Sequence, residues 1–231
     1  MYRMSSSWGG GNRFGFLRAA WLLATGLASM DRARAQTWNE QGDAPANMPG
    51  QVTQGTGPLF GIQGTIAAGG DVDLYCIRID DAAGFSATTL GGAAFDTQLF
   101  LLDAGGLGVA HDDDAPASAQ SLLTGQFVLA PGVYALGIAA WDRDAKGLAG
   151  GEIWNDVPRD LERPPDGPGA PGPLQGWNGA AQGHGPYAIQ LTCASFWSQD
   201  CTQPVITVDP AWTPARLGTD AQLSVVATGG Q

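Results

Sequence analysis

The feature that most constrains the fold is the lack of any long helical period after residue 36. Short β-prone runs alternate instead with Gly, Asp and Pro, which favour turns between strands. The chain of 231 residues contains 35 Gly and 15 Pro. Evenly spaced short strands with turn residues between them are typical of an antiparallel sandwich. We therefore expect an all-β protein, a jelly-roll-like antiparallel β-sandwich of about eight strands.

The expected strands cover residues 58–66, 72–79, 84–90, 96–103, 107–110, 121–129, 133–140 and 186–193. Residues 73–79 show the alternation of a strand, with Tyr75, Ile77 and Ile79 on one face. We expect that face to point toward a core. Residues 97–102 are more continuously apolar, which predicts a central strand buried on both sides.

A proline-rich stretch interrupts this rhythm between residues 158 and 177, where the chain has six prolines. Proline cannot donate a hydrogen bond to a sheet ladder. We therefore expect a long Pro/Gly-rich surface loop, partly polyproline-like, between the penultimate and last strands. We favour a plain insertion over a functional loop.

The first 35 residues have the pattern of a secretory signal peptide. Basic residues precede an apolar run at 19–28, and residues 33–35 (ARA) form an A-x-A cleavage site. The apolar run is short for a membrane span, although an uncleaved anchor is the alternative. Cleavage would remove five Arg and one Asp and change the net charge from −11 to −15. We expect a secreted or cell-surface protein that does not insert into a membrane after the signal is removed.

The composition argues against two classes of function. A sequence pI near 4.3 disfavours nucleic acid, because phosphate binding needs a basic face. Catalysis also lacks a motif: His111 and His184 belong to no H-E-x-x-H pattern, no G-x-S-x-G elbow is present, and Lys146 is the sole lysine. We expect a protein that is not an enzyme, and the many carboxylates leave a secreted hydrolase as an alternative.

Three cysteines bear on the fold. In an oxidising compartment we expect Cys193 and Cys201 to form a short disulfide loop. Cys76 lies inside an expected strand, where a lone cysteine is commonly a small buried apolar residue. A bridge from Cys76 to one of the other two is the alternative, and the sequence leaves it open.

Several segments, in this order, resemble the bacterial pre-peptidase C-terminal domain, a secreted β-sandwich. They are 38–44 (WNEQGDA), 62–66 (IQGTI), 71–75 (DVDLY), 85–89 (FSATT), 96–103 (DTQLFLLD), 111–114 (HDDD), 129–134 (LAPGVY) and 185–191 (GPYAIQL). The resemblance implies a non-catalytic binding or accessory role. The proline-rich loop and the paired cysteines depart from the family's simple pattern.

The end of the chain resembles a second family. Residues 204–208 (PVITV) and 218–227 (GTDAQLSVVA) resemble the opening strands of an immunoglobulin-like domain. Such a domain needs about 100 residues, so this segment would be incomplete. The expected organisation is a signal peptide at 1–35, a sandwich at 36–195, and a linker with an incomplete immunoglobulin-like segment at 196–231.

Clustered carboxylates make Ca²⁺ the expected cofactor, because hard cations prefer oxygen ligands on loops. Asp71 and Asp73 stand at a turn that enters a strand, where alternation aims both side chains to one side. Some collagen-binding members of the resembled family bind calcium between such a turn and acidic residues near the domain start. By this resemblance, Glu40 and Asp43 would complete the site.

A second candidate for calcium is the run Asp112, Asp113 and Asp114, whose mutual repulsion a divalent ion would relieve. For both clusters the alternative is a solvated turn in which Asp side chains accept hydrogen bonds from backbone N–H groups.

Three tryptophans are candidate ligand-binding residues. Trp141, Trp154 and Trp177 fall at or near expected loops, and exposed Trp stacks on sugars or anchors a protein partner. The competing interpretation, which we favour, is that they pack on the proline-rich segment. The expected function is a secreted, non-catalytic module that binds an extracellular protein or polysaccharide. The alternative is a structural spacer in a larger modular surface protein.

Overall fold

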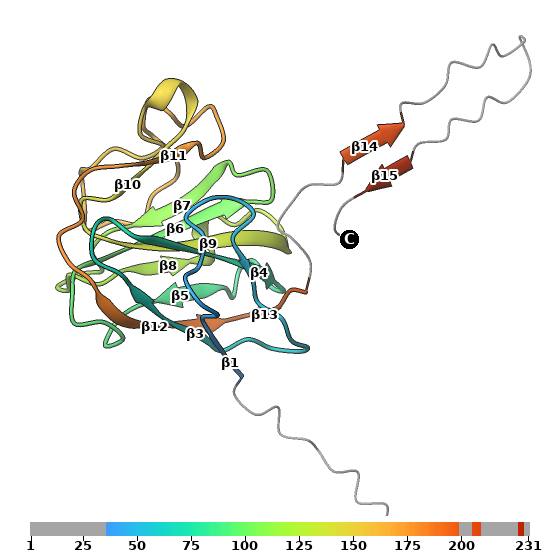
Figure 1. The fold of residues 1–231 in the computed structure, drawn as a ribbon, viewed down its shortest axis with the longest axis horizontal. Coiled ribbons are helices and arrows are strands. Elements are labelled where there is room, and N and C mark those ends of the chain that lie inside the picture. The colour runs from blue at the N-terminus through green and yellow to red at the C-terminus, as the bar shows by residue number, and fades with distance from the viewer. Residues whose placement is uncertain (1–35, 199–204, 209–225, 229–231) are drawn as a thin grey trace, which may run out of the picture. The chain divides into compact units, whose positions relative to one another are not determined.

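The computed structural model describes residues 36–198, 205–208 and 226–228. The expected signal peptide at 1–35 lies outside these residues. Two β-sheets pack face to face (Figure 1), which confirms the all-β sandwich. Among the described residues, no helix is both long and apolar enough to cross a membrane.

The first sheet has the strand order β1-β3-β12-β5-β8. Its strands are β1 (Thr37–Asn39), β3 (Gly61–Ile66), β5 (Ser86–Thr88), β8 (Leu122–Thr124) and β12 (Gly185–Thr192). The central strand β12 runs antiparallel to both β3 and β5, and β1 adds in parallel beside β3.

The second sheet has the order β13-β4-β9-β6-β7, with the short strand β2 beside β4. Its strands are β2 (Gln51–Val52), β4 (Val72–Ile79), β6 (Thr97–Asp103), β7 (Gly108–Asp112), β9 (Gly132–Ala140) and β13 (Ala194–Phe196). The eight expected strands are all present; β4 has the expected ends, and the ends of the other seven are shifted. The strand expected at 121–129 ends at Thr124, whose hydroxyl accepts a hydrogen bond from the N–H of Gln126 and caps the 3₁₀ turn η1 (Gly125–Phe127).

The main core lies between the two sheets. Tyr75, Ile77 and Ile79 of β4 point into it, as their alternation predicts. They meet Ile62 of β3 and Ile189 of β12, and all five side chains are at most 1% exposed. This alternation also places Asp73, two residues before Tyr75, on the inner side of β4.

The outer face of the second sheet carries a separate apolar cluster. Phe100 and Leu102 of β6 face outward there, and residues 141–178 cover them. This segment, the outer cover, contains β10 (Asp144–Lys146), the 3₁₀ turn η2 (Leu148–Gly150) and β11 (Gly176–Asn178). β10 and β11 pair antiparallel.

The proline-rich stretch therefore belongs to a packed layer. A Cβ on Gly108 of β7 would lie only 2.7–2.8 Å from side-chain atoms of Ile153, Trp154 and Pro165. Residues 158–175 form a long irregular segment, as the expected surface loop does, and the last two residues of the stretch belong to β11.

The structure does not show the expected disulfide. Cys193 carries a free, exposed thiol, and Cys201 lies outside the described residues. In the C-terminal segment, β14 (Val205–Val208) pairs antiparallel with β15 (Val226–Thr228), and the residues around these strands are not described.

Candidate functional site: two acidic clusters

The first cluster, which we call the inner acidic site, consists of Glu40, Asp43 and Asp73. Each offers one carboxylate oxygen, and these oxygens lie within 4.8 Å of one another. Glu40 directly follows β1, and its backbone N–H donates to the carbonyl of Gln63 at 2.8 Å. Asp73 is the second residue of β4, so the site joins the start of the sandwich to the second sheet.

Backbone groups hold the Glu40 carboxylate in place. Its Oε1 accepts from the N–H of Ala44 at 2.8 Å, and its Oε2 accepts from the N–H of Thr65 at 2.9 Å. Gly64 makes this approach sterically feasible, because a Cβ there would lie 2.7 Å from Glu40 Oε2 and would also clash with the Tyr187 hydroxyl.

Asp73 is the unusual member of the inner acidic site, because its side chain is fully buried. Its Oδ2 accepts from the Tyr187 hydroxyl at 2.6 Å, and that hydroxyl lies 2.5 Å from the Tyr75 hydroxyl. Its Oδ1 has no hydrogen-bond partner among the described residues. Burial raises the pKa of Asp73 to about 8, repulsion from the Glu40 carboxylate contributes, and the bond from Tyr187 opposes the change.

Asp71, the fourth residue expected here, does not join the group. Its carboxylate accepts from the N–H of Ala67 at 2.7 Å and from its neighbour Val72 at 2.8 Å. These are the bonds of a turn cap. Three of the four expected residues therefore come together, and Asp71 stabilises the turn before β4.

The second expected cluster is split by strand alternation. The Asp112 carboxylate accepts from the N–H of Leu122 at 2.7 Å and so points to β8. Asp113 and Asp114 instead gather with Asp96, with one oxygen of each within 4.8 Å of the others. Asp112, the last residue of β7, therefore points away from Asp113, as strand alternation dictates, whereas Asp113 and Asp114 lie beyond the strand and share one group.

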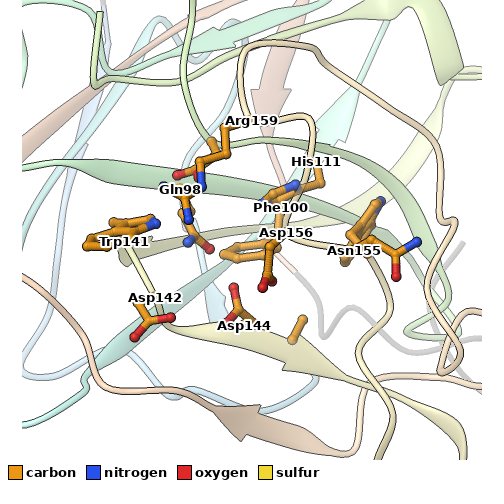
Figure 2. A pocket seen from close by; sticks show the side chains of 12 residues that line it. Gln98, Phe100, His111, Trp141, Asp142, Asp144, Asn155, Asp156 and Arg159 are labelled. Atoms are coloured by element: carbon orange, nitrogen blue, oxygen red, sulfur yellow. The ribbon is translucent and has the colours of Figure 1, made fainter.

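A third acidic group borders a small cavity under the outer cover, shown in Figure 2. Asp144 of β10, Glu152 and Asp156 bring one carboxylate oxygen each within 4.8 Å of one another. We call the cavity beside them the outer acidic pocket. It is lined by Gln98, Phe100, His111, Asp113, Trp141, Asp142, Asp144, Ala145, Trp154, Asn155, Asp156 and Arg159.

The three candidate tryptophans have different surroundings. Trp154 is only 4% exposed and packs beside Phe100, with ring centroids 5.8 Å apart. Trp177 also contacts Phe100, at 5.1 Å, and its indole N–H donates to the carbonyl of Ala46 at 2.6 Å. Trp154 and Trp177 therefore both pack on Phe100, as the competing interpretation expects, and their role in ligand binding stays a prediction.

Trp141 is half-buried at the edge of the outer acidic pocket. The guanidinium of Arg159 lies over its ring, 4.8 Å from the centroid. Trp154 lines the same cavity from its buried position, whereas Trp177 is not among the lining residues.

Sequence reasoning missed Gln98, Asp144 and Asp156. Gln98 could have been found from the sequence, since it is a polar residue inside the continuously apolar run 97–102. Such a residue at a fully buried position needs a polar partner. No sequence pattern marks Asp144 and Asp156, because the two side chains come together only through the way in which the outer cover folds. Comparisons of the chain with protein-family models, with characterised proteins and with solved structures find no match.

Proposed function

We propose that the chain is an exported, non-catalytic β-sandwich module that binds Ca²⁺ at the inner acidic site. The observation that carries this proposal is the fully buried Asp73 carboxylate, whose Oδ1 has no partner among the described residues. Two further carboxylates, from Glu40 and Asp43, stand within 4.8 Å of it. Buried polar groups normally have a partner, and a buried charge is normally paired or bound to a metal.

Calcium suits this set better than a softer metal does. The donors are carboxylate oxygens, and Ca²⁺ takes about six to eight oxygen ligands in flexible geometry. Exposed Asp43 leaves one side of the site open to water, which would supply the remaining ligands. A bound divalent ion would replace the mutual repulsion of Glu40, Asp43 and Asp73 with attraction.

The bound ion would have a structural effect. Glu40 and Asp43 lie between β1 and β2, whereas Asp73 lies in β4 and is bonded to Tyr187 of β12. Calcium at this position would tie the leading segment to both sheets. We propose that calcium stabilises the sandwich, whose loops then present a surface to an extracellular protein or polysaccharide.

Export and cysteine pairing belong to the same proposal. The basic, apolar and A-x-A pattern of residues 1–35 supports export. Because Cys193 is free, a bridge between Cys76 and Cys201 is the pairing that the three cysteines still allow.

Calorimetry on the purified chain tests the calcium proposal. Asp73→Asn keeps the size of the side chain and removes its charge, so we expect the rise in Tm on adding Ca²⁺ to be lost or strongly reduced. Asp160→Asn is the matched control, since Asp160 is exposed and belongs to none of the acidic groups. An unchanged calcium response in Asp73→Asn would overturn the proposal.

Binding of a partner needs a separate assay. We expect the calcium-loaded chain to be retained on a matrix-protein or polysaccharide panel, and we expect Trp141→Ala to weaken that retention. Calcium-stabilised protein that binds nothing on the panel would instead favour the structural spacer.

A further inference from the structure

We infer that the outer acidic pocket is a second cation site, in which Asp144 and Asp156 of the cavity wall, with the adjoining carboxylate of Glu152, bind one small, hard divalent cation. Its residues are separate from those of the inner acidic site, and it goes beyond the proposed function. The inference rests on the size of the cavity, on unpartnered polar atoms in its wall and on the charges around it.

The size of the cavity limits what it holds. The space free inside it is about 20 Å³. A single water molecule needs about 10–15 Å³ measured in this way, so the cavity has room for about one water or one ion. A sugar ring or a peptide side chain does not fit without rearrangement.

Two buried side chains present unpartnered oxygens at this cavity. Gln98 is 2% exposed and Asp113 is 5% exposed, and both line the cavity. Gln98 Oε1 and Asp113 Oδ1 lack hydrogen-bond partners among the described residues. Gln98 faces outward because it alternates with Leu99, which points into the main core. Oxygens left unpaired in so closed a place point to a ligand that accepts their lone pairs.

The Gln98 amide also connects the cavity to the acidic group. Its side chain hydrogen-bonds to Asp144, and this bond opposes the rise in the pKa of that carboxyl. Figure 2 shows the carboxylates of Asp144 and Asp156 turned toward each other below the ring of Phe100. The carboxylate pair and the Gln98 amide thus lie on neighbouring parts of the same wall.

The charge around the cavity is strongly negative. Asp113, Asp142, Asp144 and Asp156 line it, whereas Arg159 is the one basic residue among the lining residues. The Arg159 side chain is already engaged, with its Nε 3.8 Å from Asp113 Oδ2 and its guanidinium over Trp141. Burial raises the pKa of Asp144 to about 6, and repulsion from Asp156 and Glu152 adds to this. A divalent cation would offset that repulsion.

The donor set favours a hard cation over zinc. Carboxylate and amide oxygens suit Ca²⁺ or Mg²⁺, whereas zinc prefers histidine and cysteine. His111 lines the cavity and its Nε2 has no hydrogen-bond partner among the described residues, but it is in none of the three acidic groups and lies against the rings of Phe100 and Trp154, with centroids 4.7 and 5.5 Å away.

Such an ion would fasten the outer cover to the sheet. Asp144 belongs to β10, Glu152 and Asp156 lie further along the outer cover, and Gln98 belongs to β6 of the second sheet. Binding would therefore stabilise the position of the cover.

Isothermal titration of the full chain with Ca²⁺ tests the inference by counting ions. We expect two ions in the unaltered chain and in the Asp160→Asn control, and one in either Asp73→Asn or the double variant Asp144→Asn/Asp156→Asn. An unaltered chain whose single ion disappears in Asp73→Asn would overturn the pocket and keep the proposed function. A single ion that is lost only in the double variant would keep the outer acidic pocket as a cation site and overturn the proposed calcium site at Asp73.

Two further measurements distinguish a loss of cation binding from a defect in folding. Gln98→Leu removes the neutral oxygen while the apolar side chain fills its space, so we expect it to weaken the second ion at least about tenfold and to leave the metal-free Tm equal or higher. Terbium luminescence excited through tryptophan should fall in the double variant, because Trp141 and Trp154 line the cavity. Unchanged affinity and luminescence in these variants, or a preference for Zn²⁺ over Ca²⁺, would overturn the inference.

Discussion

The inner acidic site and the outer acidic pocket are held by different kinds of structure. At the inner site, backbone N–H groups of Ala44 and Thr65 fix Glu40, and two tyrosines of the main core support Asp73. At the outer pocket, Asp144, Glu152 and Asp156 come from the outer cover, which packs on Phe100 and exchanges backbone hydrogen bonds with His111 of β7 through Arg163. The inner acidic site therefore depends on the sandwich itself, whereas the outer acidic pocket exists only while the outer cover stays packed on the second sheet.

Removing a packing residue of the cover should separate the two sites most strongly. Trp154→Ala deletes a buried indole that contacts Phe100 and His111, and such truncations cost about 3–5 kcal/mol. We expect a large fall in Tm by calorimetry and loss of the outer ion, with the inner ion retained. Trp154→Phe is the milder control. Retention of both ions in Trp154→Ala would contradict the dependence of the pocket on the cover.

The converse change acts on the inner site. Gly64→Ala forces a methyl group against Glu40 Oε2 and the Tyr187 hydroxyl, and overpacking of this kind costs about 1–3 kcal/mol. We expect a moderate loss of stability in denaturant titration and loss of the inner ion alone. If the inner ion still binds with unaltered affinity, the close approach at Gly64 has no role in the site.

The stability of the metal-free protein should depend on pH through buried carboxyls at both sites, Asp73 at the inner acidic site and Asp113 at the outer acidic pocket. Burial raises the pKa values of Asp73 and Asp113 to about 8, far above the usual value of a carboxyl, so the folded state keeps protons that the unfolded state has lost. Stability should therefore fall as the pH rises from about 6.5 to 8, by a Tm change on the order of a few °C. His111 has the opposite effect on stability, because burial lowers its pKa to about 3. This effect acts only below pH 6.5, the usual pKa of a histidine, and so lies outside the range in which the carboxyls act.

The variants then assign that pH dependence to each site. Asp73→Asn and Asp113→Asn should each flatten the curve, and added Ca²⁺ should flatten it further because the ion binds the charged carboxylates. A Tm that rises over the same pH range without metal would contradict the burial of these carboxyls.

The smallest effect is expected at Cys193, which belongs to neither site. Its thiol is free and exposed, so iodoacetamide should label it in the folded chain, and Cys193→Ser should change stability by less than about 0.5 kcal/mol. Mass spectrometry without reductant reads out the label. A Cys193 that resists labelling until reductant is added would restore the pairing first expected from the sequence.

The strands were predictable because each is a local pattern. Alternation in residues 73–79 correctly placed Tyr75, Ile77 and Ile79 in the main core, and Gly and Pro marked the turns. Added strands such as β1 and β2 were missed, since both are short and pair in parallel with distant partners. β10 and β11 were missed because the segment between them is rich in proline, which is typical of a loop and not of a sheet.

The site residues likewise divide into those that a local sequence pattern predicts and those that it does not. Asp73 was predictable from its own strand, and the choice of Glu40 and Asp43 came from a family resemblance. Asp71 was wrongly grouped with them, because nearby backbone N–H groups take up its carboxylate. The run Asp112–Asp114 looked like one cluster in sequence, yet alternation sends Asp112 to β8. Residues 144, 152 and 156 meet only after the outer cover folds, which no local pattern encodes.

The most direct test of the calcium account is a crystal structure of the chain grown with Ca²⁺, with anomalous scattering used to locate the ion. The account predicts an anomalous peak between Glu40, Asp43 and Asp73, bonded to Asp73 Oδ1 at about 2.3–2.6 Å. Density for a water molecule at that position, with no anomalous signal at saturating Ca²⁺, would contradict it.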